Sequence, residues 1–249
     1  MARIRLEGVS KSFGPKLVLD RLDLEVEAGE SMVVIGGSGT GKSVMLKHII
    51  GLLRPDEGRV EIDGVEIHRL RGRELTDFRR RFGMAFQEGA LFDSMTVFDN
   101  VAFPLRRQTA LGPGEIADRV RECLELVRLE GVESKLPSQL SGGMRRRVGF
   151  ARAIAQEPQI LLFDEPTTGL DPVTTAVIDE VICGLLEGRE TTAVTITHDM
   201  TSAFRIADRI GMLHRGRIVA IAPPEEFRRL DDPRVRQFLE GRAEGPLGD

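Results

Sequence analysis

The spacing of apolar residues along the chain separates two kinds of strand from several helices. Residues 3–10 and 22–30 alternate apolar and polar side chains, which predicts strands with one buried face. Residues 59–67 alternate in the same way around Asp63 and Gly64, a dipeptide that favours the tight turn of a β-hairpin. Together these stretches predict an antiparallel strand layer on the N-terminal side.

Continuous apolar runs predict a second, more deeply buried set of strands. The runs "MVVI", "GMAF", "ILLF" and "TAVTI" are short and alternate with helical patterns, as in mostly parallel sheets covered on both faces. Residues 174–186 predict a helix, residues 210–222 predict a hairpin, and one further helix face collects Ile116, Val120, Leu124 and Val127. We expect a single α/β domain over residues 1–249, with a core at about 1–89 and 158–225, a helical insertion at about 90–157 and a tail at about 226–249.

Composition and charge narrow the class of function. The net charge of −4 over 249 residues argues against a nucleic-acid partner bound through a basic surface. No apolar run approaches the roughly 18 residues that a membrane-spanning helix needs, and the N-terminus lacks the apolar core of a signal peptide. We therefore expect a cytoplasmic protein whose membrane role, if any, comes through partners. Cys123 and Cys183 fit small buried side chains better than a disulfide framework or a zinc site.

Residues 36–43, "GGSGTGKS", match the phosphate-binding pattern G-x-x-x-x-G-K-[ST]. The alternative is a glycine-rich turn matched by chance, but a strand precedes the motif and a helix follows it, as phosphate binding requires. Lys42 is placed to reach the β- and γ-phosphates of a nucleotide, and the Ser43 hydroxyl to bind Mg²⁺. The remaining residues expected to surround the phosphates are Gly36, Gly37, Ser38, Gly39, Thr40, Gly41 and Val44.

Polar residues follow three of the predicted buried strands. Asp164 and Glu165 follow "ILLF", at the edge of the sheet where open α/β folds bind ligands. We expect Asp164 to hold Mg²⁺ and Glu165 to act as a general base on a water molecule, although the pair could also cap the turn before Pro166. His198 follows "TAVTIT" and favours a contact with the γ-phosphate over a structural role. Gln87 follows "GMAF" and has the weakest case from its position alone.

Two further features are unusual for a simple α/β fold. Phe13 is the first aromatic residue of the chain and lies in the turn-like "KSFGPK", so its ring is a candidate platform for adenine, with packing as the alternative. The predicted helix at 140–158 opens with Ser141, Gly142 and Gly143, and Arg145 begins a run of three arginines in its first turns. Cations are unfavourable at the positive end of a helix unless an anion compensates them.

These elements, in this order, resemble the ATP-binding cassette (ABC) ATPases over nearly the whole chain. "GGSGTGKS" looks like their Walker A motif, "ILLFDEP" like Walker B, "LSGGM" like the signature and residues 169–171 like the D-loop. The sequence departs from the family at Met144, where most members have Gln. The resemblance implies a P-loop NTPase cassette with a mixed RecA-like core, an N-terminal antiparallel β layer and a helical insertion.

The resemblance also implies roles for the candidate residues. ATP and Mg²⁺ would be the cofactors, with Gln87 in the Q-loop near the metal, His198 as the switch histidine and Phe13 as the adenine-stacking aromatic. Two copies of the chain would pack head to tail, so that Ser141, Gly142 and Gly143 of one copy face the ATP held by the other. That arrangement would supply the anion that the signature helix lacks.

A narrower resemblance points to the ATPase subunits of Mla and Mce-type lipid transporters. It rests on residues 99–107 ("DNVAFPLRR"), on "LSGGMRRR" and on the tail "DPRVRQFLEGRAEGP". It implies an integral membrane permease and a periplasmic Mce-type lipid-binding subunit as partners, at the cytoplasmic face of the inner membrane. The permease would contact Gln87 and residues 88–101, where the apolar side chains are Leu91, Phe92, Met95, Val97 and Phe98. The alternative is that these side chains pack the core of the insertion itself.

Other functions remain open from the sequence. A soluble mechanical ABC ATPase would usually carry two cassettes or a long coiled coil, whereas this chain has one cassette and no sustained heptads. A P-loop kinase would lack the signature motif and the paired Asp164 and Glu165. The energy subunit of a different ABC importer or exporter is a further alternative, because other subunits choose the substrate.

Overall fold

Two sheets form the framework of the protein, which a computed structural model describes at residues 2–87, 89–188 and 190–248. The first sheet is antiparallel and has the order β2-β1-β4-β5, from β1 (Ala2–Phe13), β2 (Lys16–Glu27), β4 (Glu57–Ile62) and β5 (Val65–Glu66). The predicted N-terminal antiparallel layer is therefore present. Asp63 and Gly64 both have positive φ, as the tight hairpin turn requires, but β5 ends at Glu66 and a 3₁₀ helix (Ile67–Arg69) begins at the last residue of the expected second strand.

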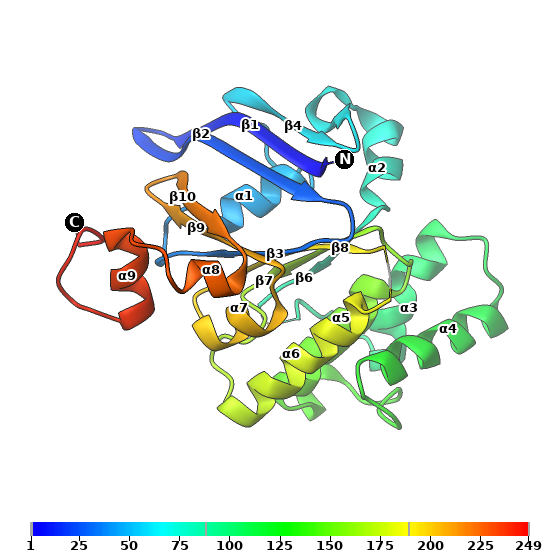
Figure 1. Ribbon diagram of the computed structural model, residues 1–249. Coiled ribbons are helices and arrows are strands. Elements are labelled where there is room, and N and C mark those ends of the chain that lie inside the picture. The colour runs from blue at the N-terminus through cyan, green and yellow to red at the C-terminus, as the bar shows by residue number, and fades with distance from the viewer. Residues whose placement is uncertain (1, 88, 189, 249) are drawn as a thin grey trace.

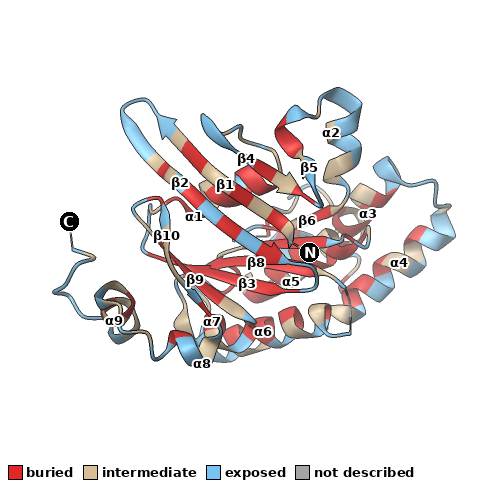
Figure 2. Cartoon of the chain, turned by 45° about the horizontal axis from the view of Figure 1, so that its top comes forward, coloured by how far each residue is buried: buried red, intermediate tan, exposed pale blue. Residues whose placement is uncertain are grey.

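The second sheet carries the buried strands and has the order β10-β9-β3-β8-β7-β6. Its parallel part consists of β3 (Ser31–Ile35), β6 (Phe82–Ala85), β7 (Ile160–Asp164), β8 (Thr192–Thr197) and β9 (Arg209–His214). β10 (Arg217–Ala222) pairs antiparallel with β9 and completes the predicted hairpin. All residues of β3 and β8 are buried (Figure 2), which explains their continuous apolar sequence.

Helices cover the second sheet and fill the space between the two sheets. α1 (Lys42–Ile49) contacts strands of both sheets and lies between them (Figure 1). α6 (Pro172–Leu186) and α7 (Met200–Ile206) lie below the second sheet, while α2 (Gly72–Arg79) lies beside the first. Near the C-terminus, α8 (Pro224–Phe227) and α9 (Pro233–Glu240) follow the β9–β10 hairpin.

Three helices lie within the predicted insertion and pack against one another: α3 (Val97–Gln108), α4 (Pro113–Leu126) and α5 (Gly142–Ile154), with a 3₁₀ helix at Pro137–Gln139. Their apolar side chains share one buried cluster with the second sheet, in which Phe150 of α5 meets Phe163 of β7 edge to face. Because this cluster runs from the insertion into the core, α5 packs directly against the strand that ends at Asp164. The division into core, insertion and tail stays a prediction.

Some details differ from the sequence-based expectation. Phe13 is the last residue of β1 and not part of the turn, which Gly14 and Pro15 make. Cys123 is fully buried, whereas Cys183 is only partly buried. Among the described residues, no helix combines the length and the apolar character needed to span a bilayer.

Candidate functional site

The phosphate loop lies between the end of β3 and the start of α1. Gly36 and Gly41 have φ angles of 155° and 107°. A Cβ atom at Gly36 would come within 2.3 Å of the Leu213 carbonyl oxygen, so only glycine fits there. Lys42 is almost fully buried, and its Nζ donates to the carbonyl oxygens of Gly36 (2.7 Å) and Gly37 (3.0 Å). The loop therefore holds an ammonium group at its centre and the N-terminal end of α1 at its rim, which is the arrangement expected for binding phosphates.

The two carboxylates after β7 face this loop. Asp164 Oδ1 accepts a hydrogen bond from Ser43 Oγ at 3.2 Å. Burial raises the pKa of Asp164, and the bond from Ser43 opposes that rise. Glu165 Oε1 lies 3.5 Å from Lys42 Nζ, which forms an ion pair across the loop. The chemistry of Ser43 and Asp164, two oxygen donors side by side, suits a hard cation such as Mg²⁺.

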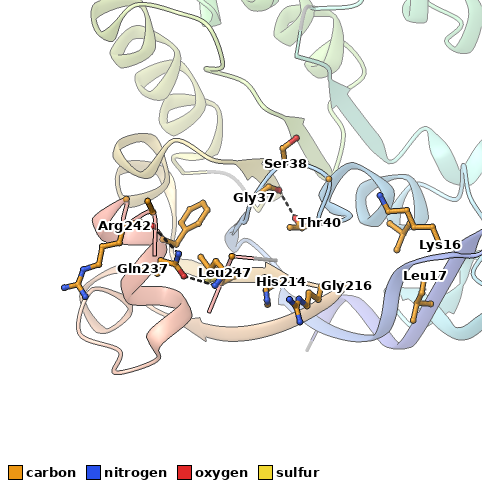
Figure 3. A pocket seen from close by; sticks show the side chains of 18 residues that line it. Lys16, Leu17, Gly37, Ser38, Thr40, His214, Gly216, Gln237, Arg242 and Leu247 are labelled. Atoms are coloured by element: carbon orange, nitrogen blue, oxygen red, sulfur yellow. Dashed lines mark hydrogen bonds between the residues drawn. The ribbon is translucent and has the colours of Figure 1, made fainter. Parts of the chain in front are cut away.

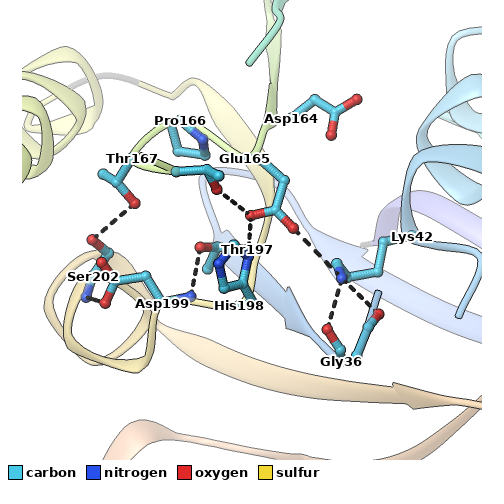
Figure 4. A network of polar contacts seen from close by, with 12 residues as sticks. Gly36, Lys42, Asp164, Glu165, Pro166, Thr167, Thr197, His198, Asp199 and Ser202 are labelled. Carbon is cyan, nitrogen blue, oxygen red and sulfur yellow. Dashed lines mark hydrogen bonds and ion pairs between the residues drawn. The ribbon is translucent and has the colours of Figure 1, made fainter. Parts of the chain in front are cut away.

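Glu165 is held by several neighbours at once (Figure 4). Its backbone has a φ of 50°, unusual for a residue with a side chain, and its N–H donates to the Ile196 carbonyl oxygen at 2.9 Å. Its Oε2 atom accepts from Thr168 Oγ1 at 2.9 Å and lies 2.9 Å from Nδ1 of His198. The carboxylate is thus fixed by Lys42 on one oxygen and by Thr168 and His198 on the other. Such constraint on an unusual backbone conformation is typical of functional sites.

His198 reaches the site from the end of β8. Asp199 caps the start of α7 by accepting from the backbone N–H groups of Thr201 and Ser202, and its own N–H donates to Thr197 Oγ1 at 3.0 Å. These bonds fix the turn that carries the imidazole. The His198 side chain is 55% exposed, so its ring faces both Glu165 and the open cavity.

A cavity of about 640 Å³ unites most of the predicted residues. Those that line it are Ser38, Gly39, Gly41, Lys42, Ser43, Val44, Gln87, Asp164, Glu165 and His198. Sequence reasoning did not identify three further lining residues, Lys16, Val18 and Thr168. Thr168 stands three residues after Glu165, and only the path of the loop shows that its hydroxyl turns back to the carboxylate.

A second cavity, of about 750 Å³, adjoins the first and shares Lys16, Val18, Ser38 and Gly39 with it. Gly37 and Thr40 line this neighbour, where Thr40 Oγ1 donates to the Gly37 carbonyl oxygen at 2.9 Å (Figure 3). The opposite walls come from the β9–β10 hairpin and from the chain around α9. The phosphate loop therefore has an open space on each side.

Phe13 lies at the surface, with 48% of the residue exposed and Lys11 Nζ 5.8 Å from the ring centre. The ring is therefore not a core side chain, which weakens the packing alternative. Phe13 is absent from the residues described as lining either cavity, so a role in stacking stays a prediction.

The signature residues lie apart from the phosphate loop of the same chain. Ser141 is exposed and caps α5, its Oγ accepting from the Met144 N–H at 3.3 Å. Gly142 lines a different cavity of about 490 Å³. A Cβ atom at Gly143 would come within 2.5 Å of Thr174 Cγ2, so this glycine lets α5 approach α6 closely. Among the described residues, none of the three signature positions lines the cavity around Lys42.

The arginines that follow the signature are compensated within the chain. Arg145 donates to the carbonyl oxygen of Leu140, and the backbone carbonyls bonded by Arg146 and Arg147 include those of Gln87, Pro166, Val127 and Arg128. The idea that these cations need an external anion was incomplete, since backbone carbonyl oxygens accept from all three. The acceptors of Arg146 and Arg147 belong to segments distant in sequence, whereas that of Arg145 is the nearby Leu140. A sequence pattern does not show such tertiary acceptors.

Comparisons with known proteins agree with this geometry. Residues 19–168 match the family model described as "ABC transporter". A Mycobacterium tuberculosis protein described as "Probable ribonucleotide transport ATP-binding protein mkl" is 47% identical, over 98% of this chain and 68% of its own length. The "Intermembrane phospholipid transport system ATP-binding protein MlaF" of Escherichia coli (strain K12) is 41% identical, over 98% of this chain and 91% of its own length.

A solved structure described as a dimeric bacterial ABC transporter cassette superposes with a TM-score of 0.83 at 36% identity, covering 89% of this chain and 98% of that one. The expected α/β cassette fold and the expected ATP-binding character are confirmed. On the family match, the sequence identities and the shared fold together, the chain belongs to the ABC transporter family.

Proposed function

We propose that this chain is the ATP-hydrolysing subunit of a membrane transporter and that it binds ATP in the cavity around Lys42. The observation that carries the proposal is the arrangement of Lys42, Glu165 and His198, which come from three separate segments and are joined by contacts of 3.5 Å or less. A carboxylate fixed in this way can act as the general base that activates the attacking water in hydrolysis.

Each site residue has a defined task in this proposal. Lys42 and the N–H groups of the loop bind the phosphates; the other loop residues are Gly36, Gly37, Ser38, Gly39, Thr40, Gly41 and Val44. Ser43, Asp164 and the side chain of Gln87 would hold Mg²⁺, which neutralises phosphate charge when bound. Glu165 takes the proton of the attacking water, and His198 orients Glu165 and meets the γ-phosphate. Phe13 stacks on adenine from the end of β1.

The ATP site is completed by a second copy of the chain. Ser141, Gly142 and Gly143 stand at the N-terminal end of α5, a 13-residue helix whose positive dipole end favours an anion; Ser141 is exposed, Gly142 is partly exposed and Gly143 is buried. They lie outside the cavity of their own chain, and a relative at 36% identity was solved as a dimer. A twofold pair would place each signature against the other copy's ATP and create two composite sites.

The segment after β6 is the proposed contact for a permease. Phe86 and Phe92 expose 37% and 42% of their surface, and Leu91, Met95 and Phe98 are partly exposed. Val97 is fully buried and packs in the core, so it drops out of the predicted contact set, and Glu88 lies outside the described residues. If this segment docks the permease, Phe92→Ala should release it without weakening ATP binding, and Val97→Ala should mainly lower stability. Retention of the permease by Phe92→Ala and by matching changes at Leu91 and Met95 would remove the idea.

We propose a phospholipid or another hydrophobic molecule as the cargo, moved between bacterial membranes with the chain at the cytoplasmic face of the inner membrane. Support for this cargo comes from the MlaF relative and from the sequence around Met144. A periplasmic Mce-type lipid-binding subunit is part of the same proposal. The mkl relative favours a ribonucleotide as the second candidate. Neither candidate involves nucleic acid binding.

One experiment separates these cargoes. The chain is co-expressed with the membrane proteins encoded beside its gene, and the complex is reconstituted into liposomes with a fluorescent phospholipid or a radiolabelled ribonucleotide. The proposal expects ATP-dependent movement of the phospholipid that Glu165→Gln abolishes. Movement of the ribonucleotide alone would assign the second candidate, and failure to bind any membrane protein would favour a mechanical ATPase instead.

A further inference from the structure

We infer that Arg146 is a positioning residue that ties the signature helix to two segments of the phosphate site, an inference that rests on the proposed ATPase function. Arg146 lies in the second turn of α5, five residues after Ser141, and is only 8% exposed. Its guanidinium donates to carbonyl oxygens in two loops that are far from α5 in sequence. One side chain therefore connects the helix that faces the partner copy with the loops that carry the reacting groups.

The first loop begins with Gln87, which lines the phosphate cavity. Arg146 Nε donates to the Gln87 carbonyl oxygen at 2.6 Å. Close packing holds the following residues to the same helix, because a Cβ atom at Gly149 would come within 2.9 Å of Gly89 Cα. One helical turn further on, Arg152 donates to the Gly89 and Ala90 carbonyl oxygens at 2.8 and 2.9 Å. The start of this loop consequently moves with α5.

The second loop follows Glu165. Arg146 Nη1 donates to the Pro166 carbonyl oxygen at 3.2 Å, and Nη2 donates to the carbonyl oxygen of Thr168. The hydroxyl of Thr168 in turn donates to Glu165 Oε2 at 2.9 Å. Arg146 thus acts on the proposed general base through a single intervening residue. It touches neither nucleotide nor water in this scheme, so it is a positioning residue and not a catalytic one.

The chemistry of the guanidinium explains why these links are stiff. A buried cation cannot give up its acceptors without a large penalty, since no water replaces them. The planar fork of arginine also fixes the directions of its donors, so the two loops are held at defined positions relative to α5. When Ser141–Gly143 engages the partner copy's ATP, a shift of α5 is passed to Gln87 and to Thr168. Binding of the second copy is thereby coupled to the positioning of Glu165.

Arg119 of α4 offers a matched control, because it contacts the opposite end of α5. Its side chain is 12% exposed, and it donates to the carbonyl oxygens of Ile154 and Ala155, both at 3.0 Å. It therefore anchors α5 with the same chemistry as Arg146 but without contact to either loop of the phosphate site. If Arg146 only stabilised the fold, Arg119→Met and Arg146→Met should change kcat to the same extent.

The test compares wild type, Arg146→Met, Arg146→Lys and Arg119→Met for thermal unfolding, ATP affinity, kcat and KM. Arg146→Met should bind ATP as wild type does but hydrolyse it at least about tenfold more slowly, because a misplacement of about 1 Å can cost on the order of 10²-fold in rate. Arg146→Lys keeps the positive charge but lacks the planar guanidinium, so its kcat should lie between those of the wild type and Arg146→Met. Arg119→Met should keep the wild-type kcat per folded molecule. In the Glu165→Gln background, Arg146→Met should also weaken ATP-dependent dimerisation.

Each outcome decides the question. A kcat for Arg146→Met equal to that of Arg119→Met would overturn the inference. If Arg146→Met does not fold, Arg146→Lys replaces it, and a wild-type kcat in that variant would overturn the inference equally. Absence of hydrolysis in the wild type would instead refute the proposed function, because the inference concerns only how fast a working site turns over.

Discussion

Replacing Glu165 with Gln is the sharpest chemical test of the phosphate site. The amide has nearly the shape of the carboxylate, so one oxygen can still accept from Thr168 and His198, as Oε2 does at 2.9 Å from each. The amide nitrogen would then face Lys42, whose Nζ lies 3.5 Å from Oε1. The ion pair is lost, but Lys42 keeps its two carbonyl acceptors and stays in place.

The magnitude follows from what the substitution removes. An amide cannot take a proton from water, and a general base typically contributes about 10²–10⁴-fold in rate. We therefore expect kcat to fall by that factor, an increase of about 3–5 kcal/mol in the activation free energy. The loop N–H groups and Lys42 are unchanged, so the ATP dissociation constant should change by less than about threefold, or about 0.7 kcal/mol.

Phosphate release measures kcat, and binding of a fluorescent ATP analogue measures affinity. Glu30→Gln is a suitable control, because Glu30 is also buried and paired, with Arg209 Nε at 2.6 Å, but does not line the phosphate cavity. Glu30→Gln should lose stability and keep its kcat per folded molecule. Near-wild-type hydrolysis by Glu165→Gln would refute the assignment of Glu165 as the base.

Further predictions concern binding and stability. Lys42→Ala should raise the ATP dissociation constant, since a charged hydrogen bond contributes about 1.5–3 kcal/mol; an affinity like that of the wild type would contradict the loop assignment. Phe13→Ala should weaken ATP binding by about 1–3 kcal/mol with little change in melting temperature, because the residue is 48% exposed; the opposite pattern would support packing. Burial lowers the pKa of His68 to about 4 from an ordinary 6.5, so the unfolded chain binds more protons between these values. The free energy of unfolding should therefore fall as the pH drops from about 6.5 towards 4. His68→Leu should reduce this dependence on pH but not remove it, because burial also lowers the pKa of His48. The free energy of unfolding is measured by denaturant titration at several pH values. An equal dependence of this free energy on pH in the variant and the wild type would contradict this account.

The sequence predicted those parts of the site that depend on local rules. The phosphate loop at residues 36–43 is a contiguous motif, and Gly36, Gly39 and Gly41 have positive φ angles, which favour glycine. Asp164, Glu165 and His198 were found because parallel strands end at one edge of a sheet, which places the residues that follow them close together. This step needed only the expectation of a parallel sheet, which the alternation of apolar runs with helical patterns was enough to support.

Contacts that depend on how loops fold back were not predicted. Nothing in the pattern around Thr168 shows that its hydroxyl reaches Glu165. Lys16 and Val18 line the cavity because β2 passes beside the phosphate loop, where Val18 lies against Gly41. The carbonyl acceptors of Arg146 at Gln87, Pro166 and Thr168 lie 59, 20 and 22 residues away in sequence. The charge run after the signature was interpreted from local helix electrostatics, and tertiary carbonyls changed that interpretation.

The mass of the ATP-bound protein tests most directly whether two copies complete each site. Light scattering on Glu165→Gln with ATP and Mg²⁺ should give twice the chain mass of 27.6 kDa, and removal of ATP should return the monomer. Adding Ser141→Arg should abolish the dimer, because a bulky cation at the exposed start of α5 would obstruct the partner's phosphates. ATP binding by the monomer should survive, since Lys42 and Ser43 are untouched. An ATP-dependent dimer that persists with Ser141→Arg would contradict the account, as would a monomer that no longer binds ATP.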